Sequence, residues 1–162
     1  PDDPILEPMW SFAEQEDIPV GIHIGPTDLN APSAHTPLHM KEVLEKHPNL
    51  RVYVMHAGYP KIEDMIQLMS DYPRVYVDLA GMLFFAPHEK SHQYLKRLVD
   101  AGFADRIMFG SDQQLWPQSI EESIRVIEKA NFLTEEQKQD IFYDNAARFF
   151  GTGRDKALGT IE

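Results

Sequence analysis

The stretch Leu50-Arg-Val-Tyr-Val-Met-His-Ala-Gly58 places a run of β-branched and aromatic residues directly before a histidine and a glycine. Such a run predicts a strand over residues 50–56. A helix is predicted over residues 62–69, because apolar residues recur there with helical spacing at Ile62, Met65, Ile66 and Met69. A strand followed at once by a helix is typical of an α/β unit.

The same alternation extends outward from this stretch in both directions. Further strands are predicted over residues 19–25, 75–79 and 105–111. Further helices are predicted over residues 5–17, 37–46, 89–99 and 119–129, and a last one runs from Thr134, which begins a capping box with Gln137, to about Phe150. Strands that alternate with helices imply right-handed βαβ units and a parallel sheet.

Four such units amount to half of a TIM-type (β/α)8 barrel, whose usual length is about 250 residues. The alternative is a small open doubly wound sheet of the nucleotide-binding kind, although the sequence lacks a glycine-rich phosphate loop. We expect one partial barrel domain over residues 1–151 and a flexible tail over residues 152–162, which show no clear period. The chain begins with Pro1, which is interpreted as the mark of a processed product, a trimmed chain or a fragment.

The composition argues against several classes of function. The 162 residues include 26 acidic and 15 basic side chains, for a formal net charge of −11. This charge disfavours nucleic acids and anionic membrane surfaces as partners. Cysteine is absent, which excludes disulfides and thiolate metal sites. No apolar run approaches the roughly 20 residues of a membrane span and no signal peptide opens the chain, so a cytoplasmic protein is expected.

Three candidate site residues stand where predicted strands end. His23 lies in the strand over residues 19–25, His56 ends the strand over residues 50–56, and Asp112 directly follows the strand over residues 105–111. The carboxyl ends of parallel strands carry the active sites of barrels and of open α/β sheets. We therefore expect these three side chains to share one site.

Strand alternation gives each of the three a predicted face. His23 shares a face with Gly21, and Asp112 shares one with Gly110, so these glycines are interpreted as leaving room for an ion. His56 falls on the face of Val54, which is typical of a residue that fills a barrel.

Two imidazoles and one carboxylate suit Zn²⁺ or another divalent first-row metal such as Mn²⁺. Such a metal would lower the pKa of a bound water or polarise a substrate oxygen, and Asp112 is also a candidate general base. Asp78 is interpreted either as an acceptor that orients a ligand histidine or as a turn residue. His35, in the loop over residues 26–36, and Trp116, close after Asp112, are candidate substrate contacts.

Four stretches together are similar to one known family. They are Leu50-Arg-Val-Tyr-Val-Met-His-Ala-Gly58, Val75-Tyr-Val-Asp78, Asp105-Arg-Ile-Met-Phe-Gly-Ser-Asp112 and Asn145-Ala-Ala-Arg-Phe-Phe-Gly151. In combination they resemble the C-terminal half of the amidohydrolase-related family. This branch of the metal-dependent hydrolases includes aminocarboxymuconate semialdehyde decarboxylase and related decarboxylases, lactonases and hydratases. The resemblance covers about residues 2–151.

The resemblance implies a (β/α)8 barrel with one metal ion, commonly Zn²⁺. It also implies hydrolysis or non-oxidative decarboxylation of a small carboxylated or cyclic substrate. His23 matches the family's fifth-strand histidine ligand. His56 matches the sixth-strand histidine, which binds the metal or contacts substrate and would stabilise oxyanion charge. Asp112 matches the eighth-strand aspartate, a metal ligand that moves the proton.

The family's His-x-His pair, which supplies two further ligands from its first strand, does not occur in this sequence. Its absence implies that the chain corresponds to strands five to eight and that it holds a metal weakly. Two sheet edges and one apolar face would then be open, so a homo-oligomer or a complementary N-terminal half-barrel is the expected partner. The alternative is a catalytically silent half-barrel that acts by self-association or by docking such a half.

Overall fold

A computed structural model, which describes residues 1–24, 36–114 and 116–152, contains one parallel sheet with the strand order β1-β2-β3-β4. The strands are β1 (Val20–His23), β2 (Val52–Met55), β3 (Val75–Asp78) and β4 (Ile107–Met108). Each strand pairs in parallel with the next one along the chain. The predicted architecture of parallel βαβ units is therefore confirmed.

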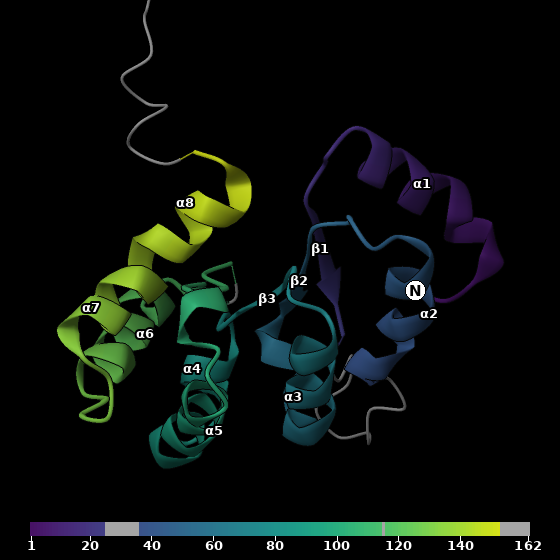
Figure 1. Ribbon diagram of the computed structural model, residues 1–162. Helices are drawn as coiled ribbons and strands as arrows, with labels where there is room; N and C mark the ends of the chain where they lie inside the picture. The colour runs from purple at the N-terminus through teal and green to yellow at the C-terminus, as the bar shows by residue number, and fades with distance from the viewer. Residues whose placement is uncertain (25–35, 115, 153–162) are drawn as a thin grey trace, which may run out of the picture.

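Helices connect and flank the strands. The α-helices are α1 (Glu7–Gln15), α2 (Lys41–Lys46), α3 (Ile62–Asp71), α4 (Met82–Phe85), α5 (His88–Asp100), α6 (Ser119–Glu128), α7 (Glu135–Gln139) and α8 (Asn145–Phe150). Short 3-10 helices lie at Pro4–Leu6, Pro37–Met40, His56–Gly58 and Ala104–Arg106, and the π-helical turn Asp140–Asp144 joins α7 to α8. In Figure 1, α1 and α2 lie on one flank of the molecule and α6 and α7 lie on the opposite flank.

One face of the sheet forms the centre of the hydrophobic core. Val52, Val54, Val75 and Val77 alternate with less buried residues along β2 and β3, and all four are fully buried. They belong to one apolar cluster with side chains from the surrounding helices, among them Met65, Leu68, Leu95, Leu98, Val126 and Ile127. Burying each such side chain contributes about 1.5–3 kcal/mol, so this face holds the helices on the sheet.

The opposite face carries aromatic residues instead of room for an ion. Tyr53 and Tyr76 are half-buried there, with their ring centroids 5.7 and 4.9 Å from that of Phe149 in α8. A Cβ added to Gly21 would lie 2.4 Å from the Tyr53 ring, and one added to Gly110 would lie 2.7 Å from the Cβ of Ala80. The interpretation that these two glycines leave space for an ion is therefore wrong, because neighbouring side chains already fill that space.

The boundaries depart from the prediction at β4 and α4. β4 ends at Met108, and the backbone N–H of the next residue, Phe109, donates to the carbonyl of Ile141 at 2.8 Å. The short helix α4 follows β3 and was not predicted from the sequence. The predicted capping box is confirmed, since Thr134 and Gln137 exchange two hydrogen bonds of 2.9 and 3.1 Å.

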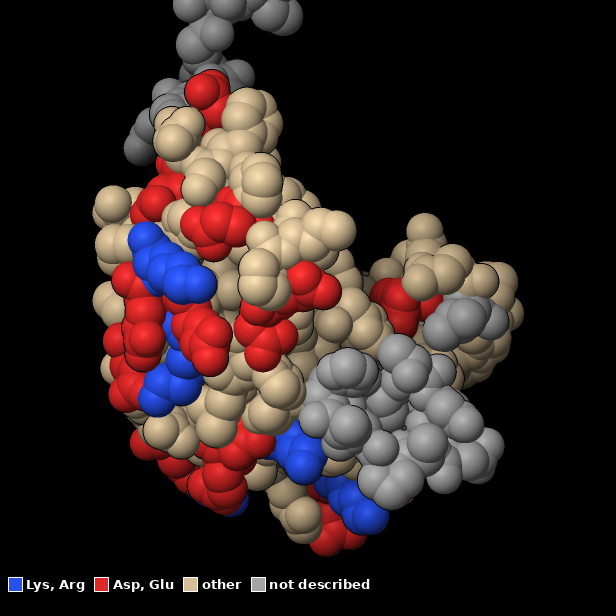
Figure 2. Space-filling model, turned by 90° about the vertical axis from the view of Figure 1, so that its right-hand side faces the viewer, with Lys and Arg blue, Asp and Glu red and all other residues tan. Residues whose placement is uncertain are grey.

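Acidic side chains are spread over the face of the molecule seen in Figure 2, with basic side chains lying among them. Several basic side chains pair with acidic ones; Lys41 contacts Asp71 at 2.9 Å and Arg97 contacts Glu63 at 2.6 Å. None of the helices in the described ranges is long and apolar enough to cross a membrane.

Candidate active site

A cavity of about 590 Å³ is lined by His23, His56 and Asp112. His23 is the last residue of β1, His56 directly follows β2, and Asp112 lies four residues beyond the end of β4. The parallel strands therefore bring the three sequence-predicted side chains to one end of the sheet. This is the end at which α/β proteins of this kind bind ligands.

The three side chains lie close to one another. The ring centroids of His23 and His56 are 4.8 Å apart, with the ring planes at 78°. Nδ1 of His56 lies 4.0 Å from Oδ2 of Asp112. Both of these side chains are mostly buried, at 22% and 16% exposure, whereas His23 is exposed.

His56 reaches the cavity through a left-handed turn. The residues His56, Ala57 and Gly58 have φ values of 56°, 49° and 66°. Positive φ is uncommon for residues other than glycine, and it breaks the strand alternation after Met55. The prediction that His56 follows Val54 onto a packed face is wrong for this reason.

Asp78 at the end of β3 holds this turn in place. Its Oδ1 accepts hydrogen bonds from the backbone N–H of His56 at 2.9 Å and from that of Ala80 at 3.0 Å. Burial raises the pKa of the Asp78 carboxyl, and these two hydrogen bonds offset the rise only in part. The sequence left two interpretations open for Asp78, an acceptor that orients a ligand histidine or a turn residue. In the structure Asp78 is a turn residue that also orients His56, and it does so by accepting from the backbone of His56 rather than from its ring.

The backbone carbonyl of Ala80 fixes the His56 ring. Nδ1 of His56 lies 2.7 Å from this oxygen, and a carbonyl oxygen can only accept a hydrogen bond. Nδ1 therefore carries the proton, and in the neutral ring Nε2 keeps the lone pair. A histidine oriented in this way can take up a proton or bind a ligand through Nε2.

Gly81 permits this close packing. It has a φ of 67°, and a Cβ at this position would lie 3.0 Å from Oδ2 of Asp112 and 3.1 Å from Nδ1 of His56. A larger residue would therefore press on both polar groups. Sequence reasoning did not identify Gly81, although a glycine two residues after a predicted strand is a recognisable signal.

The remaining walls of the cavity are largely apolar. They include Tyr59, Met82, Phe85 and Pro87, and one further basic side chain, Lys90, also lines the cavity. Tyr59 packs at 5.4 Å between ring centroids against Tyr94, whose hydroxyl donates to the carbonyl of Ala57 at 2.8 Å. Burial raises the pKa of Tyr94, so this hydroxyl stays protonated and keeps bracing the His56 turn.

The two predicted substrate contacts have different outcomes. His35 lies outside the described residues. Trp116 is 43% exposed, with its ring centroid 6.1 Å from that of Phe84, and the lining of the cavity does not include it. Its proposed contact with substrate stays a prediction.

The donor types in the cavity suit a divalent metal, since two imidazoles and a carboxylate are common zinc ligands. Their arrangement does not close around an ion. Within the ranges that the structure describes, no group of three or more His, Cys, Asp or Glu side chains is placed to hold a metal. A metal at His23, His56 and Asp112 would need side-chain movement or further ligands.

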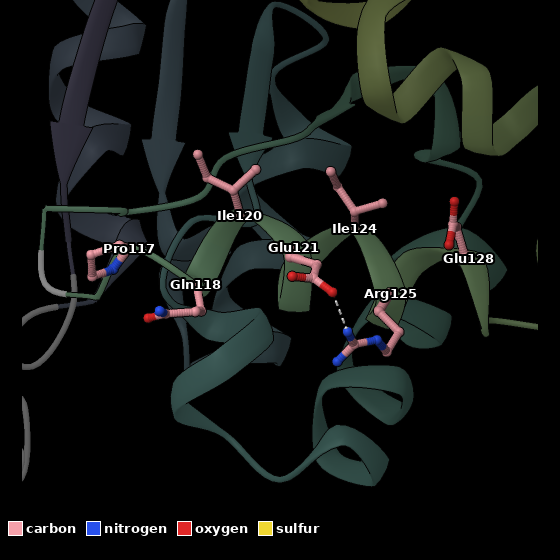
Figure 3. Close-up of a pocket in the computed structure, with 7 residues that line it drawn as sticks. All are labelled: Pro117, Gln118, Ile120, Glu121, Ile124, Arg125 and Glu128. Atoms are coloured by element: carbon pink, nitrogen blue, oxygen red, sulfur yellow. Dashed lines mark hydrogen bonds and ion pairs between the residues drawn. The ribbon is translucent and has the colours of Figure 1, made fainter.

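A second hollow, of about 460 Å³, runs along α6 and is shown in Figure 3. Ile120 and Ile124 form its apolar part, and Arg125 pairs there with Glu121 at 2.6 Å. Its residues come from α6 and the segment just before it, and none is a histidine or aspartate. The histidines and the aspartate predicted as site residues therefore line the first cavity and not the second.

Comparisons with known proteins point to one family and one fold. A family model described as amidohydrolase matches residues 1–152. An uncharacterised TIM-barrel protein from Bordetella bronchiseptica superposes with a TM-score of 0.77 at 24% identity, over 93% of this chain and 51% of that one. No curated protein matches.

Two characterised structures share the fold at lower identity. A 2,6-dihydroxybenzoate decarboxylase from Rhizobium matches with a TM-score of 0.62 at 20% identity, over 93% of this chain and 56% of that one. A 4-oxalomesaconate hydratase from Rhodopseudomonas palustris matches with a TM-score of 0.64 at 19% identity, over 97% of this chain and 52% of that one. The chain thus spans about half the length of the solved structures that it matches. Its sheet and helices correspond to part of a TIM-type barrel, as expected from the sequence.

Proposed function

This chain belongs to the amidohydrolase family, and we propose that it carries out hydrolysis or non-oxidative decarboxylation of a small carboxylated or cyclic substrate in the cavity of His23, His56 and Asp112. One observation carries the proposal: an oriented histidine and a mostly buried carboxylate lie 4.0 Å apart at the carboxyl end of a parallel sheet. Such pairs supply general acid–base catalysis.

Asp112 is proposed to move the proton. In hydrolysis it accepts a proton from water while the water oxygen bonds to the substrate carbonyl carbon, and it returns that proton to the leaving atom as the scissile bond breaks. In decarboxylation Asp112 first takes a proton from water, and it delivers this proton to the ring or chain carbon as the bond from that carbon to the departing CO₂ breaks. The positive φ of 49° at Asp112 is an uncommon backbone state of the kind found at functional sites.

When its Nε2 carries a proton, His56 is proposed to stabilise negative charge that develops on the substrate oxygen, and His23 is proposed to contact the same group. The hydrogen bond to Ala80 holds the His56 ring, so its orientation is set before the substrate arrives. A divalent metal, Zn²⁺ in the first place and Mn²⁺ as the alternative, is proposed as an addition to this site. Because the described residues do not close around an ion, none of the steps above depends on it.

The rest of the barrel wall is proposed to come from a second copy of this chain or from a complementary half-barrel. Strands β1 and β4 each pair on one side only within the described sheet, and Tyr53 and Tyr76 on its open face are half-buried. A catalytically silent half-barrel is the competing function, and the absence of an arranged metal group among the described residues favours it.

Turnover decides between the two functions. The full chain is incubated, with and without Zn²⁺, with 2,6-dihydroxybenzoate and a panel of carboxylated lactones, and products are separated by chromatography. We expect turnover of at least one compound. Asp112→Asn and His56→Gln should each lower kcat/KM at least about 100-fold, the size of a general acid–base contribution.

Asp100→Asn is the matched control, because Asp100 is an exposed aspartate that pairs with Lys96 on α5. It should leave kcat/KM unchanged. Wild-type activity that survives in Asp112→Asn would reject the assigned role, and no turnover of any compound would favour the silent half-barrel.

A further inference from the structure

The cavity contains a lysine whose charge has no partner in the described part of the chain. Lys90 lies in the first turn of α5 and lines the cavity, and its side chain makes no ion pair or hydrogen bond with the described residues. Other basic residues of the same helix are paired, Lys96 with Asp100 and Arg97 with Glu63, both at 2.6 Å. Within the described ranges, the exposed Lys90 side chain is therefore open to a counterion at the cavity.

One acidic side chain, that of Asp112, also lines the cavity. Asp112 lies beside His56 at the sheet end, and no ion pair within 4.0 Å joins it to Lys90. Glu89, the neighbour of Lys90, accepts a hydrogen bond from Gln93 at 3.3 Å and does not line the cavity. Among the described residues, Asp112 is thus the one carboxylate in the lining of the cavity.

Apolar side chains also line the cavity. Tyr59, Met82 and Pro87 line the cavity, and so does Phe85, which is 52% exposed although it is aromatic. An exposed aromatic side chain in a cavity wall is typical of a surface that a ligand covers. A flat, apolar ligand body would bury it.

We infer that Lys90 binds an anionic group of the substrate that takes no part in the reaction, while a different group of the substrate reacts beside His56 and Asp112. The assignment of the reacting group to His56 and Asp112 rests on the proposed function. The assignment of the anionic group to Lys90 rests on the charge of Lys90 and on the residues that line the cavity. The ligand class is a small, flat, apolar molecule with a carboxylate at one end. The chain carries a net charge of −11, which repels anions, and a cation in the cavity wall offsets this repulsion locally.

The test is a titration of the full chain by calorimetry with 1-naphthoate and with 1-naphthamide, its neutral analogue. A chelator is present throughout, so that no metal can hold the carboxylate. We expect Lys90→Gln to weaken naphthoate binding about three- to tenfold, the effect of one charged hydrogen bond at an exposed position. Lys90→Arg should retain the affinity, and naphthamide should bind all variants equally.

Lys96→Gln is the matched control, because Lys96 lies on the same helix and outside the cavity lining. It should leave naphthoate binding unchanged, and thermal unfolding verifies that each variant is folded. Equal naphthoate affinity in Lys90→Gln, or no naphthoate binding to the wild-type chain, would overturn the inference. These binding outcomes do not depend on turnover. If naphthoate binding depends on Lys90 but no substrate is turned over, the proposed function is rejected and the inference about Lys90 stands.

Discussion

The backbone N–H groups of His56 and Ala80 both donate to one oxygen of Asp78, at 2.9 and 3.0 Å. The Ala80 carbonyl in turn accepts from Nδ1 of His56. Asp78 thus fixes both the turn that carries the His56 ring and the residue that orients it. Its influence on the site is positional, because it acts through other residues.

Two substitutions distinguish the effect of the Asp78 hydrogen bonds on stability from the effect of its charge. Asp78→Ala leaves two N–H groups without an acceptor, so we expect a loss of about 1–3 kcal/mol in the free energy of unfolding and at least a tenfold loss of kcat/KM. Asp78→Asn keeps an oxygen acceptor and should stay within about 1 kcal/mol of the wild type. Urea denaturation measures both, and equal stability of all three proteins would show that the hydrogen bonds have little effect.

The pH dependence of stability should report the same carboxyl group. Burial raises the folded-state pKa of Asp78 above its ordinary value of 3.8, so the native state keeps this proton to higher pH than the unfolded state does. The contribution of Asp78 to stability is therefore largest below pH 3.8 and declines as pH rises through the folded-state pKa. Asp78→Asn should remove this decline; an unchanged pH profile would contradict the assignment.

The residue before the short helix α4 lies beside the acid–base pair of the site. Helix α4 begins after Gly81, and a Cβ there would contact Asp112 and His56 at 3.0 and 3.1 Å. Gly102 supplies a matched comparison, since its φ is 89° and a Cβ added to it would meet no atom within 4 Å. The two glycines share a left-handed backbone but differ in their surroundings.

Alanine at either glycine should cost about 1–2 kcal/mol of stability, because both backbones are left-handed. Only Gly81→Ala should also lower kcat/KM, by at least about tenfold, since it displaces the acid–base pair. Thermal unfolding and steady-state kinetics measure the two effects. Equal kinetics for the two variants would mean that the space beside Gly81 does not matter for catalysis.

The periodicity of the sequence predicted the strands and helices that carry the site. It predicted the geometry of the site less well. Alternation along β2 and β3 located the core valines, and the strand ends placed His23 and Asp112 near the cavity. The path of His56 could not be predicted, because it depends on three successive positive φ values held by hydrogen bonds to Asp78 and Tyr94. Long-range contacts of this kind leave no periodic signal in the sequence.

At the scale of the molecule, apolar side chains remain at the surface beside the sheet edge. Ile5, Met9 and Phe12 are 79%, 45% and 58% exposed, and their spacing places them along one side of α1 and the turn before it. Such a patch on the flank of an open sheet is typical of a surface that another chain covers. It supports the proposal that a second copy or a complementary half contributes to the fold.

Sedimentation equilibrium tests self-association directly. At tens of micromolar we expect the full chain to sediment at twice its monomer mass or more, and Met9→Ser combined with Phe12→Ser to shift it toward the monomer. Ile120→Ser, at an exposed position on α6, is the control and should leave association unchanged. A monomer at every concentration would argue against a second copy as the partner.

Whether His56 and Asp112 work as one catalytic unit can be decided by a double-mutant cycle on a turned-over substrate. Groups that act together lose their effect together, so the losses are far from additive. We expect the kcat/KM of the double variant His56→Gln/Asp112→Asn to lie within about threefold of that of the less active single variant. Losses that multiply across the two substitutions would contradict a shared site and would assign the two residues to independent roles.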